Sequence, residues 1–184
     1  PIYLATLGPN SLEYTGEVAN GWLGTSFSPD HPEAHLSFIE SGALKNGRTL
    51  RDIDLCVSAR VEIGDDLDAM IDKRRAAVAF NMGGMGSTDT NFYNDAFKRA
   101  GYAEEASIIQ ALWLAGKRDE AAKRVPDAMI TEFQLLGPKD QVKSRIQRYK
   151  EAGVTTLKLG LDGAGPLGRG RFQLLEEIVD LVTE

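Results

Sequence analysis

The sequence predicts an α/β fold of the TIM-barrel type, in which four parallel strands and their helices make up half of a (βα)8 barrel. Short apolar runs alternate with segments of helical periodicity along the 184 residues, which is typical of parallel βα units. The third run, residues 53–63, is apolar on one side and polar on the other. A doubly wound sheet is the competing architecture, but its central strands face helices on both sides, so the polar side favours a barrel. A complete barrel has eight strands, twice the number found here.

The first βα unit opens the chain. Residues 2–6 form a short apolar strand, and a Gly-Pro turn at residues 8–9 terminates it. A helix follows, because Asn10 with Glu13 three residues later fits a capping box. The Asn-Gly pair at residues 20–21 predicts the end of this helix.

The second βα unit repeats this arrangement. Residues 22–27 form a strand that a Ser-Pro-Asp turn closes. Asp30 lies three residues before Glu33, which predicts a capped helix start, and the Asn-Gly pair at residues 46–47 predicts the helix end.

A long helical excursion follows the third strand. Residues 64–66 start a helix whose apolar residues recur at helical spacing, and a glycine-rich segment at 81–91 interrupts it. Helical patterns then continue to about residue 136, so about 90 residues separate the third strand from the fourth, far more than a simple crossover needs. We expect a single domain over residues 1–184 with a helical insertion at about 81–136.

The last part of the chain holds a helix opened by residues 137–138, a fourth strand at 154–161 and a final amphipathic helix. The glycine-rich loop at 160–170, with Arg169 and Arg171, could receive a phosphate. It matches neither a P-loop nor the dinucleotide fingerprint, so a plain connecting loop is the favoured interpretation.

Composition excludes several classes of protein. The chain is 42% hydrophobic and 26% charged, with a formal net charge of −6, which argues against nucleic acid or an anionic membrane as the main partner. Cys56 is the one cysteine, so a disulfide framework within the chain is impossible and a reducing compartment is expected. No apolar run reaches the roughly 20 residues that cross a bilayer. Together these features fit a cytoplasmic enzyme.

Four stretches of the chain, in this order, resemble the C-terminal half of luciferase-like oxidoreductases, in particular the branch that uses the deazaflavin coenzyme F420. The stretches are PIYLATLGPNSLEYTGEVANGW, NMGGMGSTDTNFYNDAFKRAGY, AKRVPDAMITEFQLLGPKDQV and YKEAGVTTLKL.

The resemblance implies a fold and a chemistry. Members of this family are single (βα)8 barrels, so the four strands would be the fifth to the eighth, and the helical excursion would be the insertion that the family carries before its last strand. The implied activity is hydride transfer between coenzyme F420 and a small organic substrate. There are two alternatives. One is FMN-dependent monooxygenase chemistry, and the other is a non-catalytic half-barrel that needs a partner chain. The resemblance places the catalytic residues in the N-terminal half, so none is named here.

The first strand-to-helix turn is the candidate cofactor site. A helix N-terminus offers free backbone N–H groups to an anion, and a glycine there permits close approach. The resemblance implies that this turn contacts the ring and the phosphate-bearing tail of the cofactor, whereas a plain capped turn is the alternative. The predicted contacts are Thr6, Leu7, Gly8, Pro9, Asn10 and Ser11.

Two further segments are candidates for contact with substrate. Thr25 and Ser26 follow the second strand, at the end of a barrel where active sites lie, although turn-capping hydroxyls would look the same. Gly83, Gly84 and Met85 belong to the glycine-rich segment and could form a hinged lid or simply a connector.

Charged residues on strands are unusual, and Arg60 and Lys158 could bind an anionic substrate or cofactor tail, or merely reach solvent. His31 and His35 have a metal-ligand spacing but lack a third ligand, so no metal site is expected.

The chain is expected to associate, either as a homo-oligomer or with the missing N-terminal half of the barrel. The reason is that the outer edges of its first and fourth strands would otherwise stay unpaired.

Overall fold

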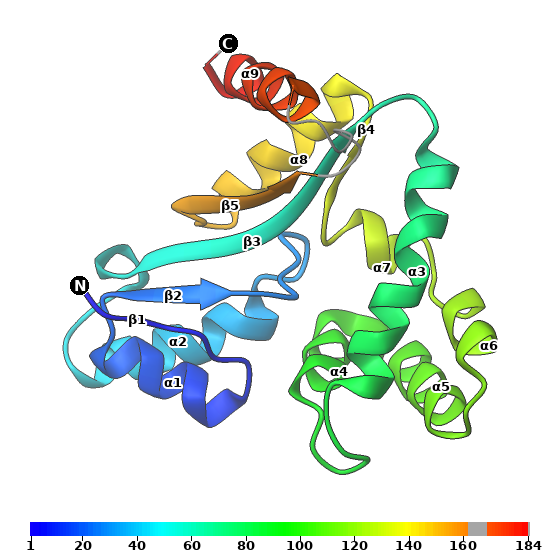
Figure 1. Cartoon of the computed structure of the whole chain (residues 1–184). Coiled ribbons are helices and arrows are strands. Elements are labelled where there is room, and N and C mark those ends of the chain that lie inside the picture. The colour runs from blue at the N-terminus through cyan, green and yellow to red at the C-terminus, as the bar shows by residue number, and fades with distance from the viewer. Residues whose placement is uncertain (162–168, 184) are drawn as a thin grey trace.

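The parallel sheet is built around one long central strand. The structure, a computed structural model, describes residues 1–161 and 169–183. β1 pairs with β2, β2 with β3, and β3 with both β4 and β5. All pairs are parallel, so the carboxyl ends of the strands point to one end of the sheet (Figure 1). The strands are β1 (Tyr3–Leu4), β2 (Gly21–Gly24), β3 (Asp54–Ile63), β4 (Leu135–Gly137) and β5 (Thr156–Leu161).

Both edges of β3 are used. Val57 pairs with Gly24 of β2 and with Leu157 of β5, and Val61 pairs with Leu135 of β4 and with Leu161 of β5. A strand residue has one neighbour on each edge, so β2 and β4 share one edge of β3 while β5 takes the other. The short β4 therefore continues the line of β2 toward the carboxyl end of β3.

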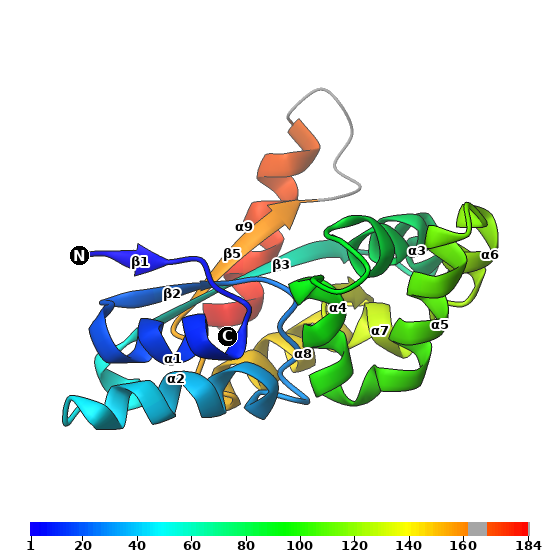
Figure 2. The ribbon, with the colours of Figure 1, turned by 90° about the horizontal axis from the view of Figure 1, so that it is seen from below.

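Helices cover one face of this sheet, and other helices lie beyond its carboxyl end. Figure 2 shows α1, α2 and α8 together on one side of the strands, and α9 packs beside α8. The helices of the insertion gather at the carboxyl end (Figure 1). None of the described helices combines the length and the apolar character that crossing a bilayer requires. The helices are α1 (Pro9–Val18), α2 (Glu33–Lys45), η1 (Leu50–Asp52), α3 (Leu67–Gly84), α4 (Phe92–Phe97), η2 (Lys98–Tyr102), α5 (Ala103–Leu114), α6 (Arg118–Lys123), α7 (Ala128–Thr131), α8 (Lys139–Glu151) and α9 (Arg169–Thr183).

The predicted fold class is confirmed, and the four predicted strands are present within two or three residues of their expected bounds. The sequence patterns continue as helix to about residue 136, whereas Leu135–Gly137 forms β4. Most of the glycine-rich loop predicted at 160–170, residues 162–168, lies outside the described residues.

The side-chain caps expected at α1 and α2 are wrong, whereas α3 starts after residues 64–66, as expected, with Asp66 as its cap. The Asp66 side chain accepts a hydrogen bond from the backbone N–H of Ala69 at the start of α3. α1 begins at Pro9 without a side-chain cap, because Glu13 instead binds Lys45 of α2 at 2.9 Å. At α2, Asp30 lies before the helix start and binds arginines of α8.

Two hydrophobic clusters stabilise the chain. The first joins the apolar side of the sheet to α1, α2, α8 and α9, with Trp22, Ile39, Leu55 and Tyr149 fully buried in it. The second lies within the insertion, between α3 and the helices α4–α7. The insertion thus has a core of its own, which lets it act as a fixed wall at the carboxyl end of the sheet.

α1 and α2 approach each other unusually closely at two glycines. A Cβ atom at Gly42 would lie 1.7 Å from the backbone oxygen of Glu13, and one at Gly16 would lie 1.9 Å from the backbone oxygen of Ile39. The obstructing atoms belong to helix backbone, so no side chain could move aside. Only hydrogen fits at either position.

We expect Gly42→Ala to destabilise the protein by roughly 1–3 kcal/mol, because α1 and α2 must separate to admit the methyl group. Helix propensity alone would give the opposite result, since alanine is favoured over glycine by up to about 1 kcal/mol. Urea unfolding measures the change, with Leu44→Ala, exposed on the same helix, as the control. A Gly42→Ala protein as stable as the wild type would show that the helices are not in this contact.

Candidate functional site

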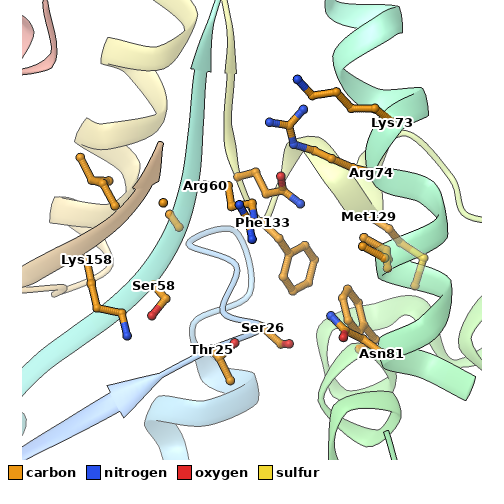
Figure 3. A pocket seen from close by; sticks show the side chains of 17 residues that line it. Thr25, Ser26, Ser58, Arg60, Lys73, Arg74, Asn81, Met129, Phe133 and Lys158 are labelled. Carbon is orange, nitrogen blue, oxygen red and sulfur yellow. The ribbon is translucent and has the colours of Figure 1, made fainter. Parts of the chain in front are cut away.

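A cavity of about 740 Å³ lies between the carboxyl end of the sheet and the insertion. Figure 3 shows Lys158 and Ser58 on the sheet side of this cavity and Asn81 and Met129 on the insertion side. Its size is typical of a pocket for a small organic ligand. The lining residues are Thr25, Ser26, Ser58, Ala59, Arg60, Lys73, Arg74, Ala77, Val78, Asn81, Phe97, Met129, Phe133, Gln134, Lys158, Leu159 and Gly160.

The polar side of β3 and β5 supplies one wall of the cavity. In the parallel register Ser58 is paired with Lys158 and Arg60 with Gly160, so these residues share a face of the sheet. Gly160 leaves room for the Arg60 side chain, whose Cγ lies 3.4 Å from the position that a Cβ would take. Arg60 and Lys158, which the sequence singles out as charged strand residues, therefore both line the cavity.

The chemical character of the cavity is cationic on one side. Four of its lining residues are Lys or Arg, and none of the described lining residues is Asp or Glu. Lys73 and Arg74 of α3 bind one carboxylate, that of Glu62, at 2.5 and 2.7 Å. Burial opposes the charge of Glu62, but the two cations prevail and lower the pKa of that carboxyl.

The insertion supplies an apolar wall. The rings of Phe97 and Phe133 have their centroids 4.6 Å apart, and Met129 and Val78 lie in the same core cluster. The Gln134 side-chain oxygen is buried there without a hydrogen-bond donor among the described residues. The wall thus offers a flat apolar surface with an unused acceptor beside it.

Ser26 has a strained backbone at the rim of this cavity. Its φ of 51° lies in the left-handed region, which residues other than glycine seldom adopt. Backbone strain of this kind concentrates at functional positions. Thr25 and Ser26, the expected substrate contacts, both line the cavity.

The predicted cofactor turn lies outside the cavity but at the same end of the sheet (Figure 1). Gly8 is buried, whereas Pro9, Asn10 and Ser11 are exposed. The Ser11 hydroxyl donates to the Gly8 carbonyl at 2.9 Å, and the backbone N–H groups of Asn10 and Ser11 have no partner in the described chain. The start of α1 therefore presents free donors to solvent, as an anion site requires.

The insertion holds this turn in place. Arg99 of η2 donates hydrogen bonds to the carbonyls of Leu7 at 2.8 Å and Ala34 at 2.9 Å. Burial lowers the pKa of the Arg99 guanidinium. The Phe92 ring lies 3.1 Å from the position of a Cβ on Gly8. Because Phe97 of the same segment lines the cavity, residues 92–102 contact both the turn and the cavity.

The glycines expected to hinge a lid are helical instead. Gly83 and Gly84 form the end of α3, and a Cβ at Gly83 would meet Trp113 of α5 at 2.2 Å. These glycines therefore let α3 and α5 pack closely, which corrects the expectation of a hinge. Met85 follows the helix and is 39% exposed, and none of the three lines the cavity.

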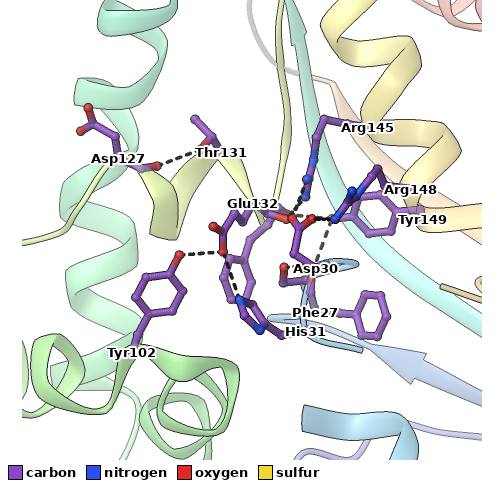
Figure 4. A network of polar contacts seen from close by, with 12 residues as sticks. Phe27, Asp30, His31, Tyr102, Asp127, Thr131, Glu132, Arg145, Arg148 and Tyr149 are labelled. Carbon is purple, nitrogen blue, oxygen red and sulfur yellow. Dashed lines mark hydrogen bonds and ion pairs between the residues drawn. The ribbon is translucent and has the colours of Figure 1, made fainter. Parts of the chain in front are cut away.

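A second polar network fixes the insertion to the sheet (Figure 4). Asp30, after β2, lies between Arg145 and Arg148 of α8. Arg145 also donates to the carbonyl of Glu132, whose side chain accepts from the Tyr102 hydroxyl at 2.6 Å. Burial opposes ionisation of Asp30, but the two arginines lower the pKa of its carboxyl.

The two histidines do not form a common site. His35 is fully buried between the rings of Trp22 and Phe27, and neither ring nitrogen has a hydrogen-bond partner among the described residues. Burial lowers the pKa of His35 to about 3, so the ring is neutral. His31 lies 3.7 Å from both Glu33 and Glu132. Within residues 1–161 and 169–183 no group of three metal-ligating side chains converges.

Sequence patterns do not reveal the insertion side of the cavity. Phe97, Met129 and Phe133 read as ordinary core residues, because their apolar character fits the second cluster equally well. Arg74 offered a signal, since it stands at an apolar position of the α3 pattern and is 5% exposed. A buried arginine needs a partner, which here is Glu62.

We expect Arg99→Met to loosen the turn after β1, because two carbonyls lose a charged donor. Hydrogen exchange should speed up in residues 5–12 by about tenfold or more. Lys98→Met, one residue away and 3.9 Å from Asp95, should leave the rate unchanged. Equal exchange in the Arg99 variant and the wild type would contradict the role of Arg99.

Asp30→Asn should lower the free energy of unfolding by about 2 kcal/mol at pH 7, since it leaves two arginines without their carboxylate. The folded-state pKa of Asp30 is lowered, so its contribution is present above the unfolded pKa of about 3.9 and is lost as the pH falls through the folded pKa. The difference between the two proteins should therefore shrink below about pH 4. Denaturant titrations from pH 7 to 2.5 test this, with Asp119→Asn, exposed on α6, as the control; a constant difference would refute it.

Known proteins share this architecture. A family model described as luciferase-like monooxygenase matches residues 1–156. A Mycobacterium tuberculosis protein named as a coenzyme F420-dependent oxidoreductase is 31% identical over 159 residues, covering 85% of this chain and 46% of the relative. The 5,10-methylenetetrahydromethanopterin reductase of Methanopyrus kandleri is also 31% identical, in an alignment that covers 96% of this chain and 48% of the relative. The chain thus spans about half the length of these curated relatives.

Solved structures agree. The coenzyme F420-dependent tetrahydromethanopterin reductase of Methanopyrus kandleri superposes with a TM-score of 0.69 at 30% identity, over 96% of this chain and 49% of that one. An F420-dependent secondary alcohol dehydrogenase gives a TM-score of 0.67 over 99% of this chain and 48% of its own, but at 16% identity it supports the fold alone. With the family model matched over most of its residues, this chain belongs to the luciferase-like monooxygenase family.

Proposed function

We propose that the protein is a coenzyme F420-dependent oxidoreductase that transfers a hydride between the deazaflavin and a small organic substrate. The observation that carries this proposal is the likeness to F420-dependent reductases over 96% of the chain. The half of a barrel mouth seen here supports it, because active sites of (βα)8 barrels lie at the carboxyl ends of the strands.

The residues present fit the two chemical parts of such a cofactor. A flat ring system needs an apolar surface, which Phe97, Met129 and Phe133 provide. A phosphate-bearing tail needs backbone donors, which the start of α1 provides. Residues 92–102 contact both places, so one segment would hold the ring wall and the tail site in register.

When bound, the deazaflavin supplies the hydride chemistry, and the chain supplies its setting. The apolar wall excludes water, and Arg99 and Phe92 fix the turn that would receive the tail. Lys158, Ser58 and Thr25 face the cavity as donors that could orient a substrate. We assign no acid or base to this chain.

FMN-dependent monooxygenase chemistry is the second candidate, because the matched family model is described as luciferase-like monooxygenase. Free N–H groups at a helix start bind the phosphate of either cofactor, so the tail site does not distinguish them.

We also propose that further strands pair with the outer edges of β1 and β5, since among the described strands each of these two is paired on one edge only. These strands would come from the rest of a longer polypeptide or from another copy of the chain.

Titration of the protein at its natural length with F420 and with FMN, followed by absorbance and fluorescence, tests the proposal. We expect F420 to bind, and we expect Ser11→Asp to weaken it at least about tenfold, because the new carboxylate repels the tail phosphate. The same carboxylate favours the helix N-terminus, so unfolding would not explain the loss. Ser144→Asp, exposed on α8, is the matched control. Binding of FMN without F420 would reject the proposal.

A further inference from the structure

Three donors form a row across the mouth of the half-barrel. Ser58 of β3 is paired with Lys158 of β5, and on the other edge Gly24 of β2 is paired with Val57, which brings Thr25 level with Ser58. Neighbouring strands lie about 4.8 Å apart. The row Thr25, Ser58 and Lys158 therefore spans about 10 Å, and all three residues line the cavity.

These donors have no described partner. The hydroxyls of Thr25 and Ser58 and the ammonium of Lys158 make no hydrogen bond or ion pair with any residue in 1–161 or 169–183. Two acidic residues share this face of β3, and both have other partners. Glu62 is bound by Lys73 and Arg74. Asp54 is bound by Thr155, Thr156 and Tyr3. It also lies four residues, about 13 Å, along the strand from Ser58, too far to neutralise Lys158.

We propose that Thr25, Ser58 and Lys158 form an anion subsite that holds a carboxylate or phosphate group of the substrate. An ammonium with two hydroxyls suits such a group, because hydrogen bonds to charged groups are stronger than neutral ones. Although Glu62 binds Lys73 and Arg74, none of the described residues that line the wider cavity is acidic. A cleft in which cationic side chains predominate concentrates anionic ligands.

The opposite wall limits the rest of the molecule. Phe97, Met129 and Phe133 line the cavity on the insertion side, and an apolar surface excludes a uniformly polar ligand. The substrate class is thus a small organic anion with an apolar or planar body. The strained backbone of Ser26, next to Thr25, is consistent with a rim shaped for a ligand.

The substrate, rather than the cofactor tail, is assigned to this subsite because the start of α1 already offers phosphate donors outside the cavity. This assignment rests on the proposed function, whereas the existence of the anion subsite does not.

Calorimetric titration with inorganic phosphate tests the subsite in the protein at its natural length. Lys158→Met should raise the phosphate Kd at least about tenfold, as expected for loss of a charged donor. Thr25→Val, which removes the hydroxyl at equal size, should raise it about threefold to tenfold. Lys158→Arg should retain binding, and Lys150→Met, exposed on α8, should leave the Kd unchanged. An equal Kd for wild type and Lys158→Met, or no phosphate binding, would overturn the subsite.

Repeating the titration with saturating F420 separates the two sources of the anion. Phosphate binding that persists with the same dependence on Lys158 supports a substrate site, whereas displacement of phosphate by F420 would overturn the substrate assignment. A protein that binds phosphate through Lys158 but fails to bind F420 would refute the proposed function and still support the anion subsite. The two failures are therefore distinguishable.

Discussion

The arrangement depends on the burial of one side of β3. Leu55, Val57, Ala59 and Val61 are buried against the helices, and the residues between them face the barrel interior. Because side chains alternate along a strand, a shift of one residue would bury the polar series and expose the apolar one. Pairing with β2, β4 and β5 is aligned to this strand, so the position of every strand-borne donor at the cavity follows from which side of β3 is apolar.

The parts predictable from sequence are those in which local pattern and tertiary burial agree. The alternation in β3 and the start of α3 after residues 64–66 are examples. Arg60 and Lys158, which stand out in the sequence as charged strand residues, both line the cavity, and their binding of an anion stays a prediction. The sequence did not predict β4, because three residues are too few to show a periodic pattern. Gly83 and Gly84 suggested a loop, but close packing against Trp113 and Phe80 keeps them helical, which overrides the low propensity of glycine.

Only one wall of the candidate site could be predicted from the sequence, and the reason is physical. Its strand wall derives from local alternation, whereas its insertion wall depends on contacts between distant segments. Glu62 faces Lys73 and Arg74 only because α3 folds back beside β3. Asp30 resembles a helix cap by spacing, yet it binds Arg145, 115 residues away. The fold decides whether a side chain makes a local hydrogen bond or binds a charged residue far along the chain. Residue spacing within one segment carries no information on that choice.

The segment 92–102 has a consequence for energetics. It contacts the turn at the start of α1 through Phe92 and Arg99, and the cavity through Phe97, and it bends between α4 and α5 at Gly101, whose φ is 92°. Two ligands that meet opposite ends of one element share its conformational free energy. Thermodynamic linkage is reciprocal. If one ligand changes the affinity of the protein for the other through this element, the second ligand changes the affinity for the first by the same factor.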